Sequence, residues 1–269
     1  MIVGNRSLLR IFAILALLAL PLAAQKVSPQ QRAGRYLESV RHQPSLLLAF
    51  LEQMPKGGDL HNHLYGAVYA ESYIEWAAQD GLCVERASLA LVKPPCDPSP
   101  GKPPAAEALK DPTLYAQLVD AFSMRDWNAA RDSGHDHFFD SFLKFDAVTT
   151  RHIGDMLAEA AELAANDRVT YLELMFAPDT DQAIRLGAQV GWNDDFAQMR
   201  QQLLANGLAD VIAAARKSLD EDEVRMRQDL HCGAPGARPG CQVTVRYLYQ
   251  VLRGLSPEQV FAQILTGFE

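Results

Sequence analysis

Residues 54–66 read MPKGGDLHNHLYG, an extended run that ends in two histidines one residue apart. Side chains alternate between the two faces of a strand, so we expect Asp59, His61 and His63 to share one face. The opposite face would carry Leu60, Asn62 and Leu64. Two imidazoles that converge on one point offer two nitrogen ligands to zinc or a similar ion. The run therefore predicts half of a metal site.

The surroundings of this run bear on its alternative interpretation, which is two polar residues on an exposed or hydrogen-bonded strand. After Gly66, apolar residues recur at helical spacing as far as Gly81. A strand that passes directly into a helix places His61 and His63 at its carboxyl end. Parallel sheets and barrels carry their ligand sites at that end, which favours the metal site.

The composition is that of a globular protein. The chain has 269 residues, of which 48% are hydrophobic and 22% charged, so global disorder is excluded. The net charge is −8 and lysines and arginines do not cluster, which argues against a nucleic-acid surface. A small-molecule substrate or a protein is the expected partner, and the oligomeric state is left open.

Residues 1–24 have the pattern of a signal peptide. Two arginines precede an apolar stretch at residues 11–20 that is too short to span a bilayer comfortably. Residues 22–24 follow shortly after it, and the last two of them are the small residues that a signal peptidase accepts. We expect a mature protein that starts near Gln25, has no membrane span, and is periplasmic or extracellular. The alternative is an uncleaved N-terminal anchor.

Four cysteines support an oxidising compartment. They lie at positions 83, 96, 232 and 241, and four cysteines allow three connectivities. We favour Cys83–Cys96 and Cys232–Cys241, because each bond would close a local loop rich in proline or glycine. Four unpaired thiols would be expected only if the protein were not exported.

In the rest of the chain, expected helices and strands alternate as in an α/β protein. Residues 25–53 form a helical lead-in, and residues 82–112 are loop-like. Two further buried strands are expected at residues 169–176 and 242–250. Helices are expected at residues 112–122, 137–145, 149–166 and 196–219, and again from Ser256, where a capping box begins.

Three strands joined through helices make an incomplete parallel fold. A barrel of this class closes with eight strands, so residues 54–269 are expected to be the first three βα units of a (β/α)8 TIM-type barrel that continues beyond the chain. The N-terminal helices and the loop and helix insertions are additions to that barrel. The rival interpretation is a compact three-stranded α/β protein, which leaves the final helix with no parallel strand to return to.

The sequence resembles the adenosine deaminase family, including its secreted growth-factor-related branch. Residues 54–67 are similar to that family's opening motif, Pro-Lys-x-x-x-x-His-x-His-Leu-x-Gly. Residues 171–178, YLELMFAP, are similar to its second barrel strand. The resemblance covers residues 54–269, tightly at these two motifs and loosely between them.

This resemblance implies a barrel that binds one zinc ion and hydrolytically deaminates an aminopurine nucleoside. His61 and His63 would be two of the metal ligands. The other ligands and the catalytic acid and base are expected beyond Glu269. The 269 residues alone are therefore expected to be inactive and to bind zinc weakly, because two histidines cannot both activate water and protonate a purine ring.

One residue departs from the family pattern. Tyr65 stands where adenosine-specific members usually carry an acid that contacts the ribose, and a tyrosine does not accept hydrogen bonds as a carboxylate does. Tyr65 remains a candidate substrate-binding residue. The alternatives to a nucleoside deaminase are another metal-dependent amidohydrolase and a secreted binding or signalling protein on the same fold.

The other polar candidates carry weaker expectations. His135 and His137 form a second His-x-His, but next to a helix, where alternate residues do not share a face. His42, His152 and His231 are expected at the surface or at helix caps. Glu173 either supports the metal site or pairs with a neighbouring strand.

Overall fold

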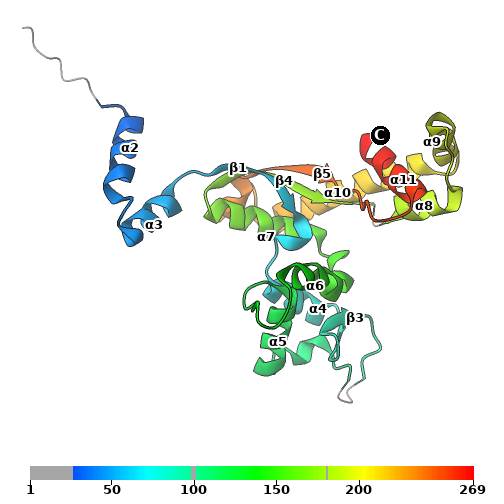
Figure 1. Cartoon of the computed structure of the whole chain (residues 1–269), viewed down its shortest axis with the longest axis horizontal. Helices are drawn as coiled ribbons and strands as arrows, with labels where there is room; N and C mark the ends of the chain where they lie inside the picture. The colour runs from blue at the N-terminus through cyan, green and yellow to red at the C-terminus, as the bar shows by residue number, and fades with distance from the viewer. Residues whose placement is uncertain (1–26, 98–100, 180) are drawn as a thin grey trace, which may run out of the picture. The chain divides into compact units, whose positions relative to one another are not determined.

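The computed structural model describes residues 27–97, 101–179 and 181–269. The expected signal peptide, residues 1–24, lies outside the described residues. The chain divides into two units, residues 1–54 and residues 55–269. Each unit is described by itself, and Figure 1 shows the elements of both.

The N-terminal unit consists of two helices, α2 (Pro29–Val40) and α3 (Pro44–Gln53). Ser28 and Gln31 form a capping box at the start of α2. The expected lead-in at residues 25–53 is therefore helical but broken before Pro44, which begins α3. Both faces of α3 carry exposed leucines, since none of its residues is buried.

The second unit is built on a parallel sheet. Its strands are β1 (Gly57–His63), β4 (Val169–Phe176) and β5 (Thr244–Tyr249), in the order β1-β4-β5. Both pairings are parallel, which confirms the α/β fold class and the three expected strands. The sheet is open in the described part of the chain, and no barrel is closed there.

One face of this sheet is covered by helices. Helix α7 (Ile153–Asn166) lies along it, and α10 (Leu208–Asp229) packs on α7 (Figure 1). The side chains of β4 that point to α7 are almost fully buried: Leu172, Leu174 and Phe176. The alternate residues Tyr171, Glu173 and Met175 point the other way and remain half-buried. The two faces of the sheet therefore differ in how much apolar surface they hide.

The segment between β1 and β4 is more ordered than its composition predicts. It contains η1 (Leu64–Gly66), α4 (Ala70–Gln79), the antiparallel pair β2 (Cys83–Glu85) and β3 (Ala90–Val92), η2 (Ala105–Glu107), α5 (Pro112–Phe122) and α6 (Gly134–Thr149). The loop expected at residues 82–112 is thus a small hairpin with a short helix. The Cys83–Cys96 disulfide links the first strand of this hairpin to the segment that follows the second.

The segment between β4 and β5 is helical. It contains α8 (Gln182–Val190), α9 (Phe196–Ala205), α10 and η3 (Pro239–Gln242), and α11 (Pro257–Phe268) follows β5. The single helix expected at residues 196–219 is wrong, because Gly207, with a φ of 106°, separates α9 from α10. Helix α10 then continues through the acidic residues 220–223 as far as Asp229. The capping box expected at Ser256 is present at the start of α11.

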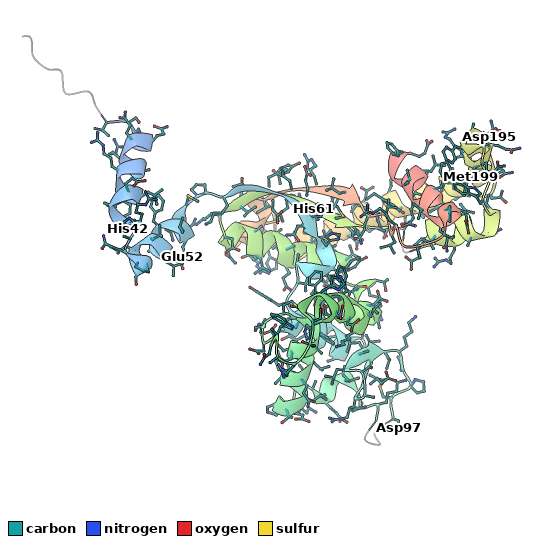
Figure 2. The ribbon with its side chains drawn as sticks, viewed as in Figure 1. His42, Glu52, His61, Asp97, Asp195 and Met199 are labelled. Carbon is teal, nitrogen blue, oxygen red and sulfur yellow. A yellow bond between two sulfur atoms is a disulfide. The ribbon has the colours of Figure 1, made fainter. Side chains whose placement is uncertain are left out.

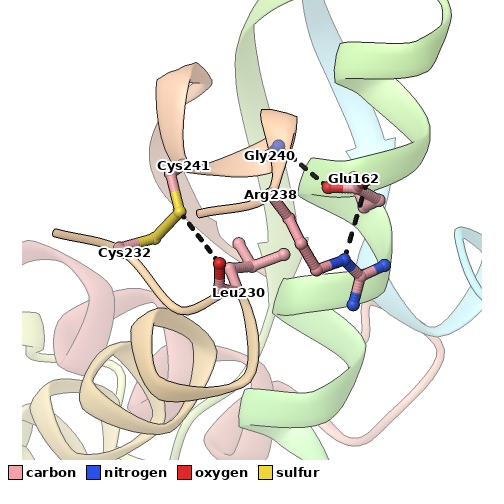
Figure 3. Close-up of a disulfide and its surroundings, with 6 residues drawn as sticks. All are labelled: Glu162, Leu230, Cys232, Arg238, Gly240 and Cys241. Atoms are coloured by element: carbon pink, nitrogen blue, oxygen red, sulfur yellow. Dashed lines mark hydrogen bonds and ion pairs between the residues drawn. A yellow bond between two sulfur atoms is a disulfide. The ribbon is translucent and has the colours of Figure 1, made fainter. Parts of the chain in front are cut away.

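The second disulfide, Cys232–Cys241, docks its loop on α7 (Figure 3). The backbone N–H of Gly240 donates to Glu162 Oε2 at 2.9 Å, and Arg238 lies 3.7 Å from the same carboxylate. A Cβ on Gly240 would lie 2.9 Å from the backbone nitrogen of Glu162, so only glycine fits against the helix. The disulfide pairing inferred from the loop sequences is present in both cases.

Two of these findings bear on location. None of the helices within residues 27–97, 101–179 and 181–269 has both the length and the apolar character that a membrane crossing requires. Two disulfides are compatible with an extracellular or periplasmic protein.

Candidate functional site

The start of β1 depends on its two glycines. Gly57 has a φ of 81°, a conformation that strongly favours glycine. Gly58 lies beneath the ring of Tyr171 in the neighbouring strand, and a Cβ there would be 3.2 Å from Tyr171 Cδ1. The Gly57-Gly58 pair therefore lets β1 begin close against β4 and run toward the histidines.

A register shift interrupts β1 between Asp59 and Asn62, a stretch that includes His61. Asp59 is in register with Leu172 and Asn62 with Leu174, so β1 carries one more residue than β4 over this stretch. Asp59 and Asn62 consequently lie together, and Asn62 Nδ2 donates to Asp59 Oδ2 at 2.8 Å. The expected sharing of one face by Asp59 and the histidines is wrong, because strict alternation fails at this irregularity.

The two histidines nevertheless come together at the carboxyl end of β1. The ring centroids of His61 and His63 are 5.3 Å apart, and the rings are inclined at 72°. His61 is exposed (Figure 2) and His63 is half-buried. In the described residues no group of three or more His, Cys, Asp or Glu side chains is arranged to hold a metal ion. The metal role of the pair stays a prediction at this point, and the structure shows only that the two rings are close neighbours.

A glutamine from β5 contacts the second histidine. Gln250 directly follows β5, and its Oε1 lies 3.2 Å from Nδ1 of His63. The backbone N–H of Gln250 donates to the carbonyl of Phe176, which continues the β4–β5 ladder by one more bond. The side chain therefore crosses the end of β4, the strand between β5 and β1.

Tyr65 lies two residues after His63, in η1. Its carbonyl accepts a hydrogen bond of 2.9 Å from the hydroxyl of Tyr73, a residue buried in the core. Burial, together with the nearby carboxylates of Asp146 and Asp181, raises the pKa of the Tyr65 hydroxyl to about 12. Tyr65 is therefore a neutral hydrogen-bond donor at physiological pH.

An aspartate at the end of β4 joins neighbouring elements. Asp179 is 1% exposed and accepts two hydrogen bonds of 2.8 Å, from the backbone N–H of Ala183 in α8 and from the hydroxyl of Tyr249 in β5. Neither Asp179 nor Gln250 is indicated by a motif. Their shared signal is position, since each closely follows the carboxyl end of a parallel strand.

The remaining strand candidate, Glu173, lies on the half-buried face of the sheet. Its Oε1 accepts a hydrogen bond of 2.9 Å from the hydroxyl of Tyr171. In the register of the sheet, Glu173 is opposite Arg246 of β5. The hydrogen bond lies within β4 itself, so both expected roles of Glu173, support of the metal site and pairing with a neighbouring strand, stay predictions.

The two histidines of the second His-x-His have different environments. His135 is exposed, and its Nδ1 lies 2.9 Å from Asp136 Oδ1. Both ring nitrogens of His137 face oxygen atoms, Nδ1 that of Asp132 at 3.2 Å and Nε2 the carbonyls of Asp120 and Ser123 at 3.0 Å. His137 therefore fastens the start of α6 to the end of α5.

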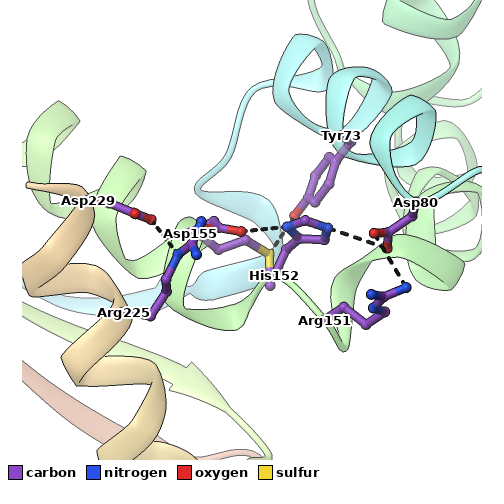
Figure 4. Close-up of polar contacts among 8 residues, drawn as sticks. Tyr73, Asp80, Arg151, His152, Asp155, Arg225 and Asp229 are labelled. Carbon is purple, nitrogen blue, oxygen red and sulfur yellow. Dashed lines mark hydrogen bonds and ion pairs between the residues drawn. The ribbon is translucent and has the colours of Figure 1, made fainter. Parts of the chain in front are cut away.

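His152 is expected at the surface or at a helix cap, and it is the N-cap residue of α7. The residue is 9% exposed rather than at the surface, and its ring stacks on Trp76, with ring centroids 5.0 Å apart. Nδ1 lies 2.5 Å from Asp155, and Nε2 lies 3.4 Å from Asp80 at the end of α4 (Figure 4). The residue marks the N-terminus of α7, as a cap would, but its ring ties α7 to α4.

A half-buried carboxylate on α10 faces the same end of α7. Asp222 accepts a hydrogen bond from the backbone N–H of Gly154, in the first turn of α7. Burial nevertheless raises the pKa of Asp222 to about 6, and the nearby Glu221 and Asp155 add to the rise. The folded protein therefore carries a carboxylate that ionises less readily than it would in the unfolded chain.

We expect Asp222→Asn to stabilise the protein at neutral pH only. A raised carboxyl pKa costs stability as pH increases from about 4 to about 6, because the unfolded chain loses the proton first. Asparagine keeps the acceptor for Gly154 and carries no charge. For a half-buried group the gain is about 1 kcal/mol above pH 7 and close to zero at pH 4.

Urea unfolding at several pH values measures this difference. Asp220→Asn, an exposed change on the same helix, is the matched control and should shift stability equally at all pH values. A gain for Asp222→Asn that is the same at pH 4 and pH 7 would contradict the raised pKa.

No family model matches the chain, and no curated protein matches it.

Proposed function

We propose that the chain is part of an exported, zinc-dependent aminohydrolase of the adenosine deaminase type, built on a TIM-type barrel. The two-sided character of the sheet supports the barrel. The β4 side chains that face α7 are buried, whereas the opposite face holds half-buried Tyr171 and Met175. Barrels place helices outside and fill the inside with side chains from all strands. In this proposal, further strands pair with the edges of β1 and β5 and cover the half-buried face.

The observation that carries the proposal is the meeting of two imidazoles at the carboxyl end of a parallel strand. His61 and His63 present rings 5.3 Å apart between centroids, at the end where such sheets bind ligands. Neutral imidazole is a common ligand of zinc, and no carboxylate or third histidine completes the set among the described residues. The pair thus fits two positions of a zinc site, with the others supplied by further strands.

In this proposal, the residues of the chain have separate roles in metal binding and in substrate binding. Bound zinc supplies the acidity that brings a coordinated water to ionise near neutral pH. His61 and His63 would hold the ion. Tyr65, neutral and beside the pair, would donate a hydrogen bond to an oxygen or nitrogen atom of the substrate. The motif around the histidines points to an aminopurine nucleoside as that substrate.

Ammonia release from adenosine and other aminopurine nucleosides tests this function. We expect turnover and one bound zinc per chain for the protein expressed from the complete reading frame that contains this sequence. We expect neither turnover nor tight zinc binding for residues 25–269 alone. Turnover by residues 25–269 alone would contradict the proposal, and so would a complete protein that lacks zinc and deaminates no nucleoside.

The same measurement separates the alternatives. A complete protein that holds zinc but releases no ammonia from any nucleoside would point to another amidohydrolase reaction. A complete protein that binds neither zinc nor a nucleoside would point to a binding or signalling role on the same fold.

A further inference from the structure

The contact between His63 and Gln250 joins two residues that are far apart in the sequence. They are 187 positions apart, and Oε1 of Gln250 lies 3.2 Å from Nδ1 of His63. His63 is in register with Met175 of β4, which is in register with Leu248 of β5. Because side chains alternate along a strand, Gln250 shares the face of Leu248 and can reach diagonally toward β1.

The segment that carries Gln250 is held on both sides. Its own backbone N–H donates to the carbonyl of Phe176 at 3.1 Å. Two residues later, the backbone N–H of Leu252 donates at 2.8 Å to Oε1 of Gln263, a side chain of α11 that is 1% exposed. The turn after β5 is therefore fixed by both β4 and α11. A side chain on such a turn has a defined direction, which a positioning role requires.

The chemistry of this contact concerns the proton of the imidazole ring. A neutral imidazole carries one proton, and only the unprotonated nitrogen can bind a metal ion. The amide oxygen of Gln250 accepts a hydrogen bond and cannot donate one, so it favours the ring form with the proton on Nδ1 of His63. In that form the lone pair is on Nε2, which is the nitrogen directed away from Gln250.

We propose that Gln250 is a positioning residue that holds His63 in its Nδ1–H tautomer and thereby presents Nε2 as the metal-binding atom. The metal part of this inference rests on the proposed function, whereas the tautomer is a property of the chain itself. Ligating histidines generally use their second nitrogen for such an outer contact, which fixes the tautomer and the ring orientation. A neutral amide does so without adding a negative charge beside the ligand.

The orientation of the Gln250 amide determines which tautomer of His63 is favoured, and the two tautomers can be distinguished by experiment. If the amide were reversed, its NH₂ group would donate to Nδ1 and favour the Nε2–H form, in which Nε2 cannot bind a metal. Two-bond ¹H–¹⁵N spectra of the ¹⁵N-histidine-labelled chain, recorded at a pH where imidazole is neutral, distinguish the two forms. The signals of His63 are identified by their absence in His63→Ala.

We expect the Nδ1–H form of His63 to predominate in the wild-type chain and in Gln250→Glu, which keeps the accepting oxygen. Gln250→Ala should lose this preference. Gln242→Ala, an exposed glutamine that precedes β5, is the matched control and should leave it unchanged. A wild-type His63 in the Nε2–H form, or a preference that survives in Gln250→Ala, would overturn the inference.

Zinc titration gives a second readout that separates this inference from the proposed function. Loss of an outer partner weakens metal binding by on the order of tenfold, and we expect that loss in Gln250→Ala but not in Gln242→Ala. A chain with the expected tautomers that binds no zinc would support the role of Gln250 and count against the zinc site. A chain that binds zinc equally with and without Gln250 would overturn its role toward the metal.

Discussion

Replacing Leu174 with alanine is expected to lower the free energy of unfolding by about 3 kcal/mol, whereas Met175→Ala should cost less than about 1 kcal/mol. The two residues are neighbours near the carboxyl end of β4, and both are large and apolar. Leu174 is completely buried against the α7 side of the sheet, and Met175 is half-buried on the other side. Truncation of Leu174 therefore leaves a cavity, but truncation of Met175 mainly removes surface that water already reaches.

Urea unfolding followed by circular dichroism measures both values, and each variant is the control for the other. Equal losses would mean that both faces of the sheet are buried in this chain, contrary to the open sheet described. In the complete barrel that we propose, Met175 would lie inside, and there the cost of Met175→Ala should rise toward that of Leu174→Ala.

The elements that could be predicted from the sequence are those whose signals are local. The strand at residues 169–176 is a nearly continuous apolar run between turn signals, and the helix that begins after Ser256 has a capping box. Such patterns state the type of an element. They do not state which face is covered, because Leu174 and Met175 are equally apolar in the sequence and differ only in their tertiary neighbours.

Two expectations from the sequence are wrong because a local pattern does not continue as expected along the chain. Alternation was extended from Asp59 to His63, but the register shift between Asp59 and Asn62 changes the face on which residues lie. The helix expected at residues 196–219 also ends too early, since α10 continues through the acidic residues 220–223 to Asp229. Charged residues are good helix formers on an exposed face, so an acidic run does not end a helix by itself.

The residues of the candidate site also differ in whether the sequence predicts their positions. His61 and His63 are two residues apart, a spacing that predicts neighbouring rings on a strand, and the rings are neighbours even though His61 lies within the register shift. Gln250 meets them only through the order of the strands in the sheet, which the sequence does not state. His152 is a further example, since its partners Asp80 and Trp76 come from α4, more than 70 positions earlier in the chain.

Removal of either histidine of the first pair is expected to abolish the weak zinc binding of the chain. A second ligand on the same strand acts at a high effective concentration, so its loss should weaken binding by on the order of 100-fold. We expect this loss for His61→Ala and for His63→Ala alike. Calorimetric titration of zinc into the chain measures the affinity, and far-ultraviolet circular dichroism verifies that each variant remains folded.

The chain contains its own matched control for this prediction. His135 and His137 have the same spacing, but His135 contacts Asp136 in the first turn of α6, and both nitrogens of His137 face oxygen atoms. Their rings are thus engaged separately, and His135→Ala should leave zinc binding unchanged. If His135→Ala weakened binding as much as His63→Ala, the ion would be bound by scattered surface histidines. Spacing is common to both pairs, so a difference between them would show that the end of a parallel strand, rather than the His-x-His pattern, makes the metal site.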